Sequence, residues 1–584
     1  MYIEKINSPE DLKKIPINEL SIVCDEIRKI ILEKVSKYGG HVGPDLGAVE
    51  AIVAMHYVFN SPIDKIVFDV SHQSFAHKIL TGRRDAFINN DVSEYTNPKE
   101  SDHDFFIMGH TSPSVSMCCG LAKARDLKGD KNNIIAFIGD GALSGGEAFE
   151  GLDNVSAIGT NMIIVVNDNH WSIAESHGGI YKNLELLRES DGMHECNYFR
   201  SLDLDYIYEN EGNNIIKLIE MFQNLKDIDH PIVLHINTIK GYGYEPALKN
   251  EEEFHYMPPF DIKTGKSIVD LSKTENYSVI TGEYLIEKMK VNPKLIAITS
   301  ATPAIFGYNA DTRKKLGNQF IDVGIAEEHA VAFSSGLAKG GANPVYGVYG
   351  TFLQRAFDQL SEDLSMNKNS AVILVFLTGV YGIPDESHQC FFDIIEISNI
   401  PNMVYLAPIC KEEYMSMLEW SINQKSNPVA IRVPTDGVIS KSIEFDKDYS
   451  DLNKFQIISQ GSKVAIIAVG SFFKFGETVA EMLENKSGIK PTMINPRYLS
   501  GIDSDMLENL KKDHDIVITI EDGIVEGGYG EKISGYYGTS NIIVKNYGFK
   551  KEFIDRYKPE ELMKSIGLTD SNIVNDILSM IKSI

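Results

Sequence analysis

The sequence lacks the features of a secreted, disulfide-bonded or membrane-spanning protein. Its six cysteines show no CxxC spacing, and no uninterrupted apolar segment reaches ~18 residues. The N-terminus mixes charges throughout and has no apolar core of a signal peptide. We therefore expect a cytoplasmic protein with reduced thiols and no membrane contact.

Basic residues are also scarce. The chain holds 56 Lys and Arg against 82 Asp and Glu, which gives a formal net charge of −26. This acidic excess disfavours nucleic acid and anionic membrane surfaces as partners, and solubility is its simplest consequence.

The chain of 584 residues is too long for a single core. Strand-like apolar runs alternate with helical segments almost from end to end, which is typical of α/β domains with parallel sheets. Six such runs lie between residues 295 and 433, and three lie between 463 and 548. Polar, loop-like stretches at 240–267 and 440–454 interrupt the pattern. We predict three doubly wound α/β domains, at residues 1–270, 277–440 and 455–584.

One βαβ unit carries the first sign of chemistry. Ile134–Ile138 and Met162–Val166 read as buried parallel strands, and Gly146–Ile158 reads as the crossover helix between them. Asp140 and Asn169 follow the two strands, so they should converge at the carboxyl edge of the sheet. Their oxygens could bind a hard divalent cation, although both residue types are also common loop caps.

Glu327 supplies a second, distant signal. In "QFIDVGIAEEHAVAFSSGLAKGG" it follows an apolar run and begins a predicted helix. Together with Gly139-Asp140-Gly141 and Asn169, it resembles the thiamine diphosphate enzymes of the transketolase superfamily.

The resemblance extends to the 1-deoxy-D-xylulose 5-phosphate synthase family. The segments that carry it include "YGGHVGPDLGAVEAIVAMHYVFNSP", "FDVSHQSFAHKILTGRRDAF", "MGHTSPSVSMCCGLAKA", "KGYGYEP", "YGTFLQRAFDQL" and "SHQCFFD". Weaker similarity continues through "NPRYLSGID" and "EDGIVEGGYG". The resemblance implies diphosphate-binding, pyrimidine-binding and transketolase C-terminal domains in that order, and an active site formed within a homodimer.

The resemblance also implies an activity. The enzyme would use thiamine diphosphate and Mg²⁺ to decarboxylate pyruvate or a related 2-oxo acid and to ligate the two-carbon unit to an aldehyde. Mg²⁺ would bind to Asp140, Asn169 and the main-chain carbonyl of Trp171. Glu327 would hydrogen-bond the aminopyrimidine and promote deprotonation of the thiazolium. The remaining cofactor contacts implied are His72, Gly109, His110, Thr111, Gly141, Ala142, Tyr244 and Phe352.

Further residues are implied around the reacting carbon. His41 and His255 would stabilise oxyanions or relay protons, a role suited to side chains that titrate near neutrality. His388 is a third implied active-site histidine. Tyr349, Phe352 and Arg355 would form a wall around the reacting groups, whereas His56 and His77 are assigned to packing.

The sequence departs from the family where the acceptor's phosphate should bind. Leu377 and Thr435 replace two arginines, and Pro384-Asp385-Glu386-Ser387-His388 replaces an Asp-Gly-x-Thr-His motif. Pro44 and Asp45 stand where small residues are usual. We therefore expect an acceptor other than glyceraldehyde 3-phosphate, unless Arg432, Arg355 or a lysine outside the motifs substitutes.

Other activities stay open. Ketol transfer from a sugar donor, as in transketolase, is the nearest alternative, and a 2-oxo acid dehydrogenase component is a weaker one. An inactive cofactor-binding paralogue is disfavoured, because binding alone would not require Glu327. The "GGYG" at 527–530 does not fit GxGxxG, so we interpret it as a loop of the third domain.

Overall fold

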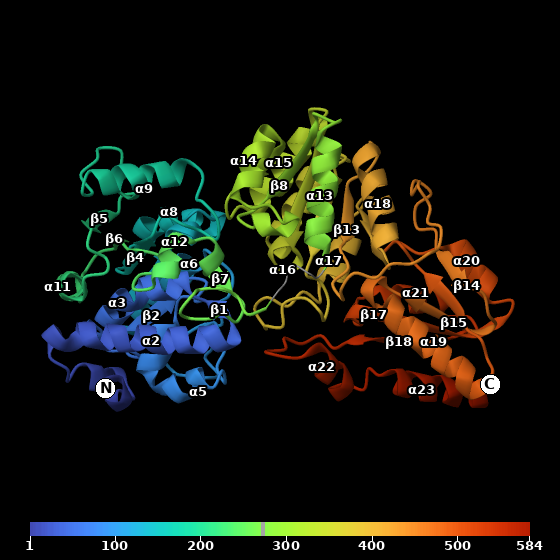
Figure 1. Cartoon of the computed structure of the whole chain (residues 1–584), viewed down its shortest axis with the longest axis horizontal. Helices are drawn as coiled ribbons and strands as arrows, with labels where there is room; N and C mark the ends of the chain where they lie inside the picture. The colour runs from blue at the N-terminus through green and yellow to red at the C-terminus, as the bar shows by residue number, and fades with distance from the viewer. Residues whose placement is uncertain (270–274) are drawn as a thin grey trace. The chain divides into compact units, whose positions relative to one another are not determined.

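The computed structural model describes residues 1–269 and 275–584, which form two compact units (Figure 1). The first unit holds the residues before the gap together with Gly324–Ala326, and the second unit holds the rest. Within the described ranges, no helix is both long and apolar enough to cross a bilayer.

The first unit is built on a five-stranded parallel sheet in the order β2-β3-β4-β6-β5. Its strands are β2 (Lys65–Phe68), β3 (Ile134–Gly139), β4 (Ile163–Asp168), β5 (Asp205–Glu209) and β6 (Ile232–Asn237).

Helices cover both faces of this sheet, as the side-chain alternation of β3 shows. Ile135 and Phe137 belong to the core formed with α2 (Leu20–Tyr38), α3 (Gly43–Val58) and α11 (Ile215–Leu225). The intervening residues of β3 pack in the opposite direction, against α6 (Ser114–Lys128) and α8 (Gly146–Ile158). Because successive side chains of a strand point to opposite faces, a strand that is apolar throughout must be covered on both sides.

The first unit also contains a small antiparallel ribbon outside the main sheet. In it β1 (Gly40–His41) pairs with β7 (Tyr256–Met257), and His41 lies opposite Tyr256. The ribbon thereby brings together two histidine-bearing segments that are more than 200 residues apart, His41 and η4 (Glu253–His255).

The second unit contains two sheets. The six-stranded parallel sheet has the order β12-β13-β11-β10-β8-β9, and the five-stranded sheet has the order β14-β16-β15-β17-β18 with only β14 antiparallel to its neighbour. The strands of the first of these sheets are β8 (Leu295–Thr299), β9 (Phe320–Asp322), β10 (Asn343–Tyr349), β11 (Val372–Phe376), β12 (Val404–Leu406) and β13 (Val429–Arg432). Those of the second are β14 (Gln456–Ser459), β15 (Lys463–Ala468), β16 (Thr492–Asn495), β17 (His514–Ile524) and β18 (Ile543–Phe549).

One apolar core joins the two sheets of the second unit. It combines Val348 and Ile373 of the six-stranded sheet with Ile467 and Val517 of the five-stranded sheet. Separate cores cover the outer face of each sheet. The prediction of three α/β domains built on largely parallel sheets is confirmed.

Candidate active site

The carboxyl edge of the first unit's sheet brings Asp140 and Asn169 together, as the βαβ pattern predicted. β3 and β4 are neighbours with Gly139 opposite Asn167, and α7 (Asp140–Leu143) begins directly after β3. The Asp140 carboxylate accepts a hydrogen bond from the Asn169 backbone. The two residues therefore lie side by side at the strand ends.

Asp140 is suited to holding a cation. It is 1% exposed, and its Oδ2 has no hydrogen-bond partner among the described residues. Burial, followed by the neighbouring charge of Asp168, raises the pKa of Asp140 well above its ordinary value. Burial without a partner and repulsion from Asp168 both disfavour the charged form of Asp140. A bound cation would offset both effects.

The loop after β4 is folded tightly. His170 adopts a left-handed backbone conformation with a φ of 70°, and the Trp171 backbone N–H donates to Asn169 Oδ1 at 3.2 Å. Lys240 Nζ donates to the Ser172 carbonyl at 2.7 Å, and burial lowers the pKa of Lys240 to about 8. Asn169 and the Trp171 backbone are thus held beside Asp140 by a buried amine that the sequence analysis did not single out.

Asp168 is a second residue that the sequence analysis missed. It is fully buried, pairs with Arg188, and accepts from His235 Nε2 at 2.9 Å. Burial alone would raise the pKa of Asp168, but the His235 bond and the Arg188 charge lower it. Tyr206 continues the network, with its hydroxyl 2.8 Å from His235 Nδ1. The available signal was its place in "VVNDN", directly before the candidate ligand Asn169.

A second loop reaches the same sheet edge. Asp69, just after β2, accepts from the backbone N–H groups of Ser112 and Ser114 at 2.7 and 2.9 Å. Ser112 Oγ donates to the Ala142 carbonyl at 2.8 Å. Because Ser112 directly follows the predicted Gly109-His110-Thr111, these bonds hold that loop next to α7.

Gly141 is closely packed at this edge. A Cβ on Gly141 would lie 3.2–3.4 Å from three atoms of Ser172. The small residue lets α7 approach the Asn169–Ser172 loop, so backbone groups of residues 141 and 142 are presented at the strand ends.

Three predicted histidines of the first unit cluster. One ring nitrogen from each of His41, His72 and His255 lies within 4.8 Å of the others. Burial, and then the positive charge of Lys240, lowers the pKa of His255 well below its ordinary value, which keeps its ring neutral at pH 7. We call these three residues the His cluster.

Tyr244 is placed differently from these residues. Its ring packs against Phe254 and Phe260, with centroids 5.7 and 6.3 Å away, and its hydroxyl donates to the Ile262 carbonyl at 2.8 Å. These contacts fix the Tyr244 ring in place, and its role as a cofactor contact stays a prediction. His56 and His77, which were assigned to packing, are both fully buried and 2.8 Å apart through Nε2 and Nδ1.

Glu327 lies in the second unit, at the first position of α15 (Glu327–Lys339). It is 4% exposed, and within the chain as described its Oε2 makes no hydrogen bond, although Arg355 Nη1 is 3.8 Å away. Burial raises the pKa of Glu327 to about 7, against the opposing charge of Arg355. A carboxyl group with this pKa exchanges its proton readily at neutral pH.

Aromatic side chains follow the end of β10 in the same unit. The rings of Tyr349 and Phe352 have centroids 5.8 Å apart, and those of Phe352 and His388 are 5.7 Å apart. His388 Nδ1 lies 2.9 Å from Ser387 Oγ and 3.7 Å from Asp385 Oδ1. The structure therefore gathers Tyr349, Phe352 and His388 in one wall.

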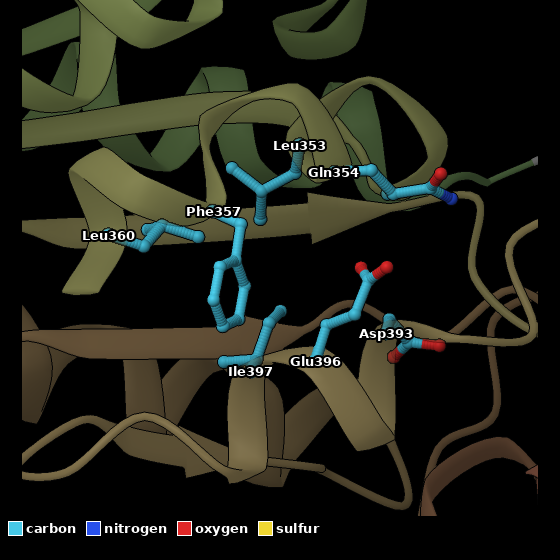
Figure 2. Close-up of a pocket in the computed structure, with 8 residues that line it drawn as sticks. Leu353, Gln354, Phe357, Leu360, Asp393, Glu396 and Ile397 are labelled. Atoms are coloured by element: carbon cyan, nitrogen blue, oxygen red, sulfur yellow. The ribbon is translucent and has the colours of Figure 1, made fainter.

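A pocket lies beside this wall, between residues 350–360 and α17 (Asp393–Ser398). Figure 2 shows Leu353, Phe357 and Leu360 on one side and Glu396 and Ile397 on the other. None of the predicted site residues lines the described pocket.

Arg432 was considered as a substitute phosphate ligand, and the structure shows its partners. It is 3% exposed, forms two hydrogen bonds to Asp393 at 2.6 and 3.2 Å, and pairs with Asp522 through Nη1. Thr435 Oγ1 donates to the Thr378 carbonyl at 3.1 Å, and Leu377 has a left-handed φ of 54°. Arg432 is therefore committed to two buried carboxylates.

The "GGYG" segment at 527–530 crosses from a turn into the first two residues of α21 (Tyr529–Tyr537), with Gly528 as the N-cap. The Glu521 carboxylate accepts from the backbone N–H groups of Tyr529 and Gly530, both at 2.8 Å. A side chain at Gly528 would collide with this carboxylate. The protein's own anion thus occupies the helix start, and the loop interpretation holds for Gly527 and Gly528 only.

Comparison with known proteins places these observations in a family. Residues 3–197 match the model of 1-deoxy-D-xylulose-5-phosphate synthase, residues 274–438 match the transketolase pyrimidine binding domain, and residues 453–573 match the transketolase C-terminal domain. A 1-deoxy-D-xylulose-5-phosphate synthase of Caldanaerobacter subterraneus subsp. tengcongensis is 37% identical, with 99% of each chain covered. One of Clostridium beijerinckii is 35% identical with the same coverage. The chain therefore belongs to the 1-deoxy-D-xylulose-5-phosphate synthase family of transferases, within the transketolase superfamily.

Proposed function

We propose that the protein uses thiamine diphosphate and Mg²⁺ to transfer a two-carbon unit from pyruvate or a related 2-oxo acid to an aldehyde, as a cytoplasmic homodimer. The observation that carries this proposal is a pair of buried carboxylates. Asp140 and Glu327, which the resemblance assigns to the metal and to the pyrimidine ring, each keep an oxygen without a hydrogen bond in the described chain. Such groups are expensive in a fold unless a ligand satisfies them.

The first unit would hold the diphosphate and the metal. Asp140, Asn169 and the Trp171 carbonyl offer the oxygen ligands that Mg²⁺ prefers. Backbone groups of Gly141 and Ala142, together with the Gly109–Thr111 loop and His72, would contact the diphosphate.

The second unit would serve the ring. Thiamine diphosphate, when bound, supplies a carbon nucleophile. Glu327 would hold a proton at Oε2 and hydrogen-bond the aminopyrimidine, for which its pKa of about 7 is suited. His41 and His255 would bind or move protons at the substrate oxygens, and Tyr349, Phe352, Arg355 and His388 would exclude water.

We further propose that the acceptor is an aldehyde without a phosphate group. Leu377 and Thr435 carry no charge, and Arg432 is already neutralised by Asp393 and Asp522. A hydrogen bond to a charged group contributes ~1.5–3 kcal/mol, so two missing arginines should weaken binding of a phosphate ester by roughly 3–6 kcal/mol.

Carboxylates near these positions add repulsion. Burial, followed by the charges of Asp436, Glu560 and Asp522, raises the pKa of Tyr381 to about 12. Burial and then the Glu560 charge raise the pKa of Asp436. A phosphate dianion beside these groups would be disfavoured further.

The activity is tested by measuring CO₂ release from pyruvate with Mg²⁺ and thiamine diphosphate, in the presence of an aldehyde. Wild-type protein should release CO₂, whereas Glu327→Gln should lose nearly all turnover. Turnover of ketose donors without CO₂ release would favour the transketolase alternative, and no turnover with any donor would contradict the proposal.

The acceptor is tested separately with glyceraldehyde and glyceraldehyde 3-phosphate. We expect kcat/KM to favour the unphosphorylated aldehyde. A micromolar KM for the phosphorylated one would refute this part and leave the transferase activity standing.

A further inference from the structure

The His cluster of the first unit also brings together three side chains of the metal-ligating kind. The ring centroids of His41, His72 and His255 lie 4.7 Å (41–72), 5.5 Å (41–255) and 5.4 Å (72–255) apart. Each residue offers one ring nitrogen within 4.8 Å of the other two. We propose that the His cluster binds a transition-metal ion of the Zn²⁺ type, and that this ion inhibits the enzyme.

The ligand chemistry separates this site from the magnesium site. Three imidazoles with an open fourth position are a common zinc arrangement, and imidazole suits Zn²⁺, Co²⁺ and Ni²⁺. Mg²⁺ prefers oxygen ligands in octahedral geometry, which Asp140 and Asn169 offer and the His cluster does not.

The distances require a small inward movement. Since these nitrogens are at most 4.8 Å apart, an ion at the centre of an equilateral triangle of that size would lie about 2.8 Å from each, and an approach of at most about 0.7 Å reaches the ~2.0–2.1 Å of a Zn–N bond. Small rotations about the side-chain bonds of an imidazole cover such a distance without movement of the backbone.

The backbone that carries the His cluster is well tied. His41 lies on β1 and pairs with Tyr256 of β7. His255 directly precedes Tyr256 in the sequence, so the ribbon holds both histidines. The segment that carries His72 is fixed on both sides, because Gln73 Nε2 donates to the Asp69 carbonyl at 3.0 Å and the Phe75 backbone N–H donates to Asp45 Oδ1 at 3.0 Å.

His41 and His255 also have polar neighbours of the kind that orient metal-binding histidines. Glu94 Oε2 lies 3.4 Å from His41 Nδ1, and the Ser172 carbonyl accepts a hydrogen bond from the His255 ring. Metal-binding histidines usually donate their second ring N–H to a carboxylate or a carbonyl, which fixes the ring orientation.

The inhibitory effect follows from occupancy. A metal ion would take the imidazole lone pairs that His41 and His255 need for proton transfer. Metal binding depends on the His cluster alone, whereas the inhibition also rests on the proposed function.

The site is tested with Co²⁺ as a spectroscopic probe. Co²⁺ alone is titrated into the full-length chain while excess Mg²⁺ occupies oxygen-lined sites. We expect intense visible absorption bands of four-coordinate Co²⁺, which a stoichiometric amount of Zn²⁺ abolishes. Because the loss of an outer-shell partner already costs about 10–100-fold in metal affinity, His41→Gln and His255→Gln should each weaken Co²⁺ binding at least as much.

His230→Gln is the matched control, since this exposed histidine of the same unit lies beside both Asp205 and Asp229. It should leave the spectrum unchanged. Only weak six-coordinate bands in the wild-type protein, or intense bands that survive both cluster variants in correctly folded protein, would overturn the metal site. Zn²⁺-insensitive turnover in protein that shows the bands would overturn the inhibition alone.

Discussion

Single residues carry the strongest sign of function, because they are buried at a cost that the fold itself does not explain. The acidic residues Asp140 and Glu327 are each at least 95% buried, and so is the basic residue Lys240. Side chains of this kind are usually exposed or fully paired. Asp140 directly follows β3 and Glu327 begins α15, so both carboxyl groups lie at ends of elements.

Glu327 leads to a prediction about stability. Its pKa is about 7 in the folded protein and about 4.3 in an unfolded chain, so the folded state binds more protons between these values. The free energy of unfolding therefore falls as the pH rises through this window, and the cost is complete above about pH 7. The difference between the two pKa values corresponds to roughly 3–4 kcal/mol. The test is urea unfolding without cofactor, at pH 4 and at pH 8. The free energy of unfolding of Glu327→Gln, taken relative to wild type, should be about 3 kcal/mol higher at pH 8 than at pH 4.

The neighbouring Glu328→Gln is the control for this prediction. Glu328 lies on the same helix but is only half-buried, so its replacement should give little difference between the two pH values. An equal gain in both variants would contradict the assignment of the cost to Glu327.

The Asp168 network gives a second prediction at this scale. Asp168 adjoins Asn169 and is held by Arg188 and His235, so it acts as an outer support of the proposed metal site. Asp168→Asn should weaken Mg²⁺ binding about 10–100-fold, measured by calorimetry in the presence of thiamine diphosphate. Asp205→Asn, an exposed carboxylate of the same sheet, should leave it unchanged. Equal affinities in all three proteins would show that Asp168 has only a packing role.

The site is built at the ends of strands, and these strand ends were the part of the site that the sequence predicted best. The βαβ pattern predicted β3, α8 and β4, and with them the proximity of Asp140 and Asn169. The pattern could not predict the side-chain bonds that hold the loops, such as Ser112 to Ala142, because these depend on packing between distant segments. The edge strand β14 escaped for a similar reason, since a short, half-exposed strand lacks a strong apolar run.

Arg432 provides the prediction at the scale of elements. It ends β13, and its partner Asp522 lies on β17, so the ion network ties the two sheets of the second unit together. Removing one partner of a buried ion network typically costs about 3–5 kcal/mol, because the other charges stay buried and unpaired. Arg432→Met should therefore lower the urea midpoint of the second unit strongly. Lys558→Met, which breaks an exposed pair with Glu561, should change it little. A small effect of Arg432→Met would mean that the network is not structural and would return Arg432 to the candidates for phosphate binding.

At the scale of the whole molecule, family and domain order could be read from the sequence, and the acceptor could not. The motifs that carry the resemblance are spread over the chain, and the comparisons cover 99% of it. The proposal on the acceptor rests on positions in separate segments, the uncharged Leu377 and Thr435 and the paired Arg432. The sequence alone left Arg432 available for a phosphate, whereas the structure commits it to Asp393 and Asp522.

The most direct test of the central claim is calorimetric titration of thiamine diphosphate into the full-length chain with Mg²⁺, for wild type, Asp140→Asn and Glu327→Gln. The account predicts tight binding to wild type that disappears when Mg²⁺ is removed. Asp140→Asn should weaken this binding strongly, whereas Glu327→Gln should bind the cofactor but release no CO₂ from pyruvate. Absence of binding to the wild-type protein, or binding that is indifferent to both Mg²⁺ and Asp140, would contradict it.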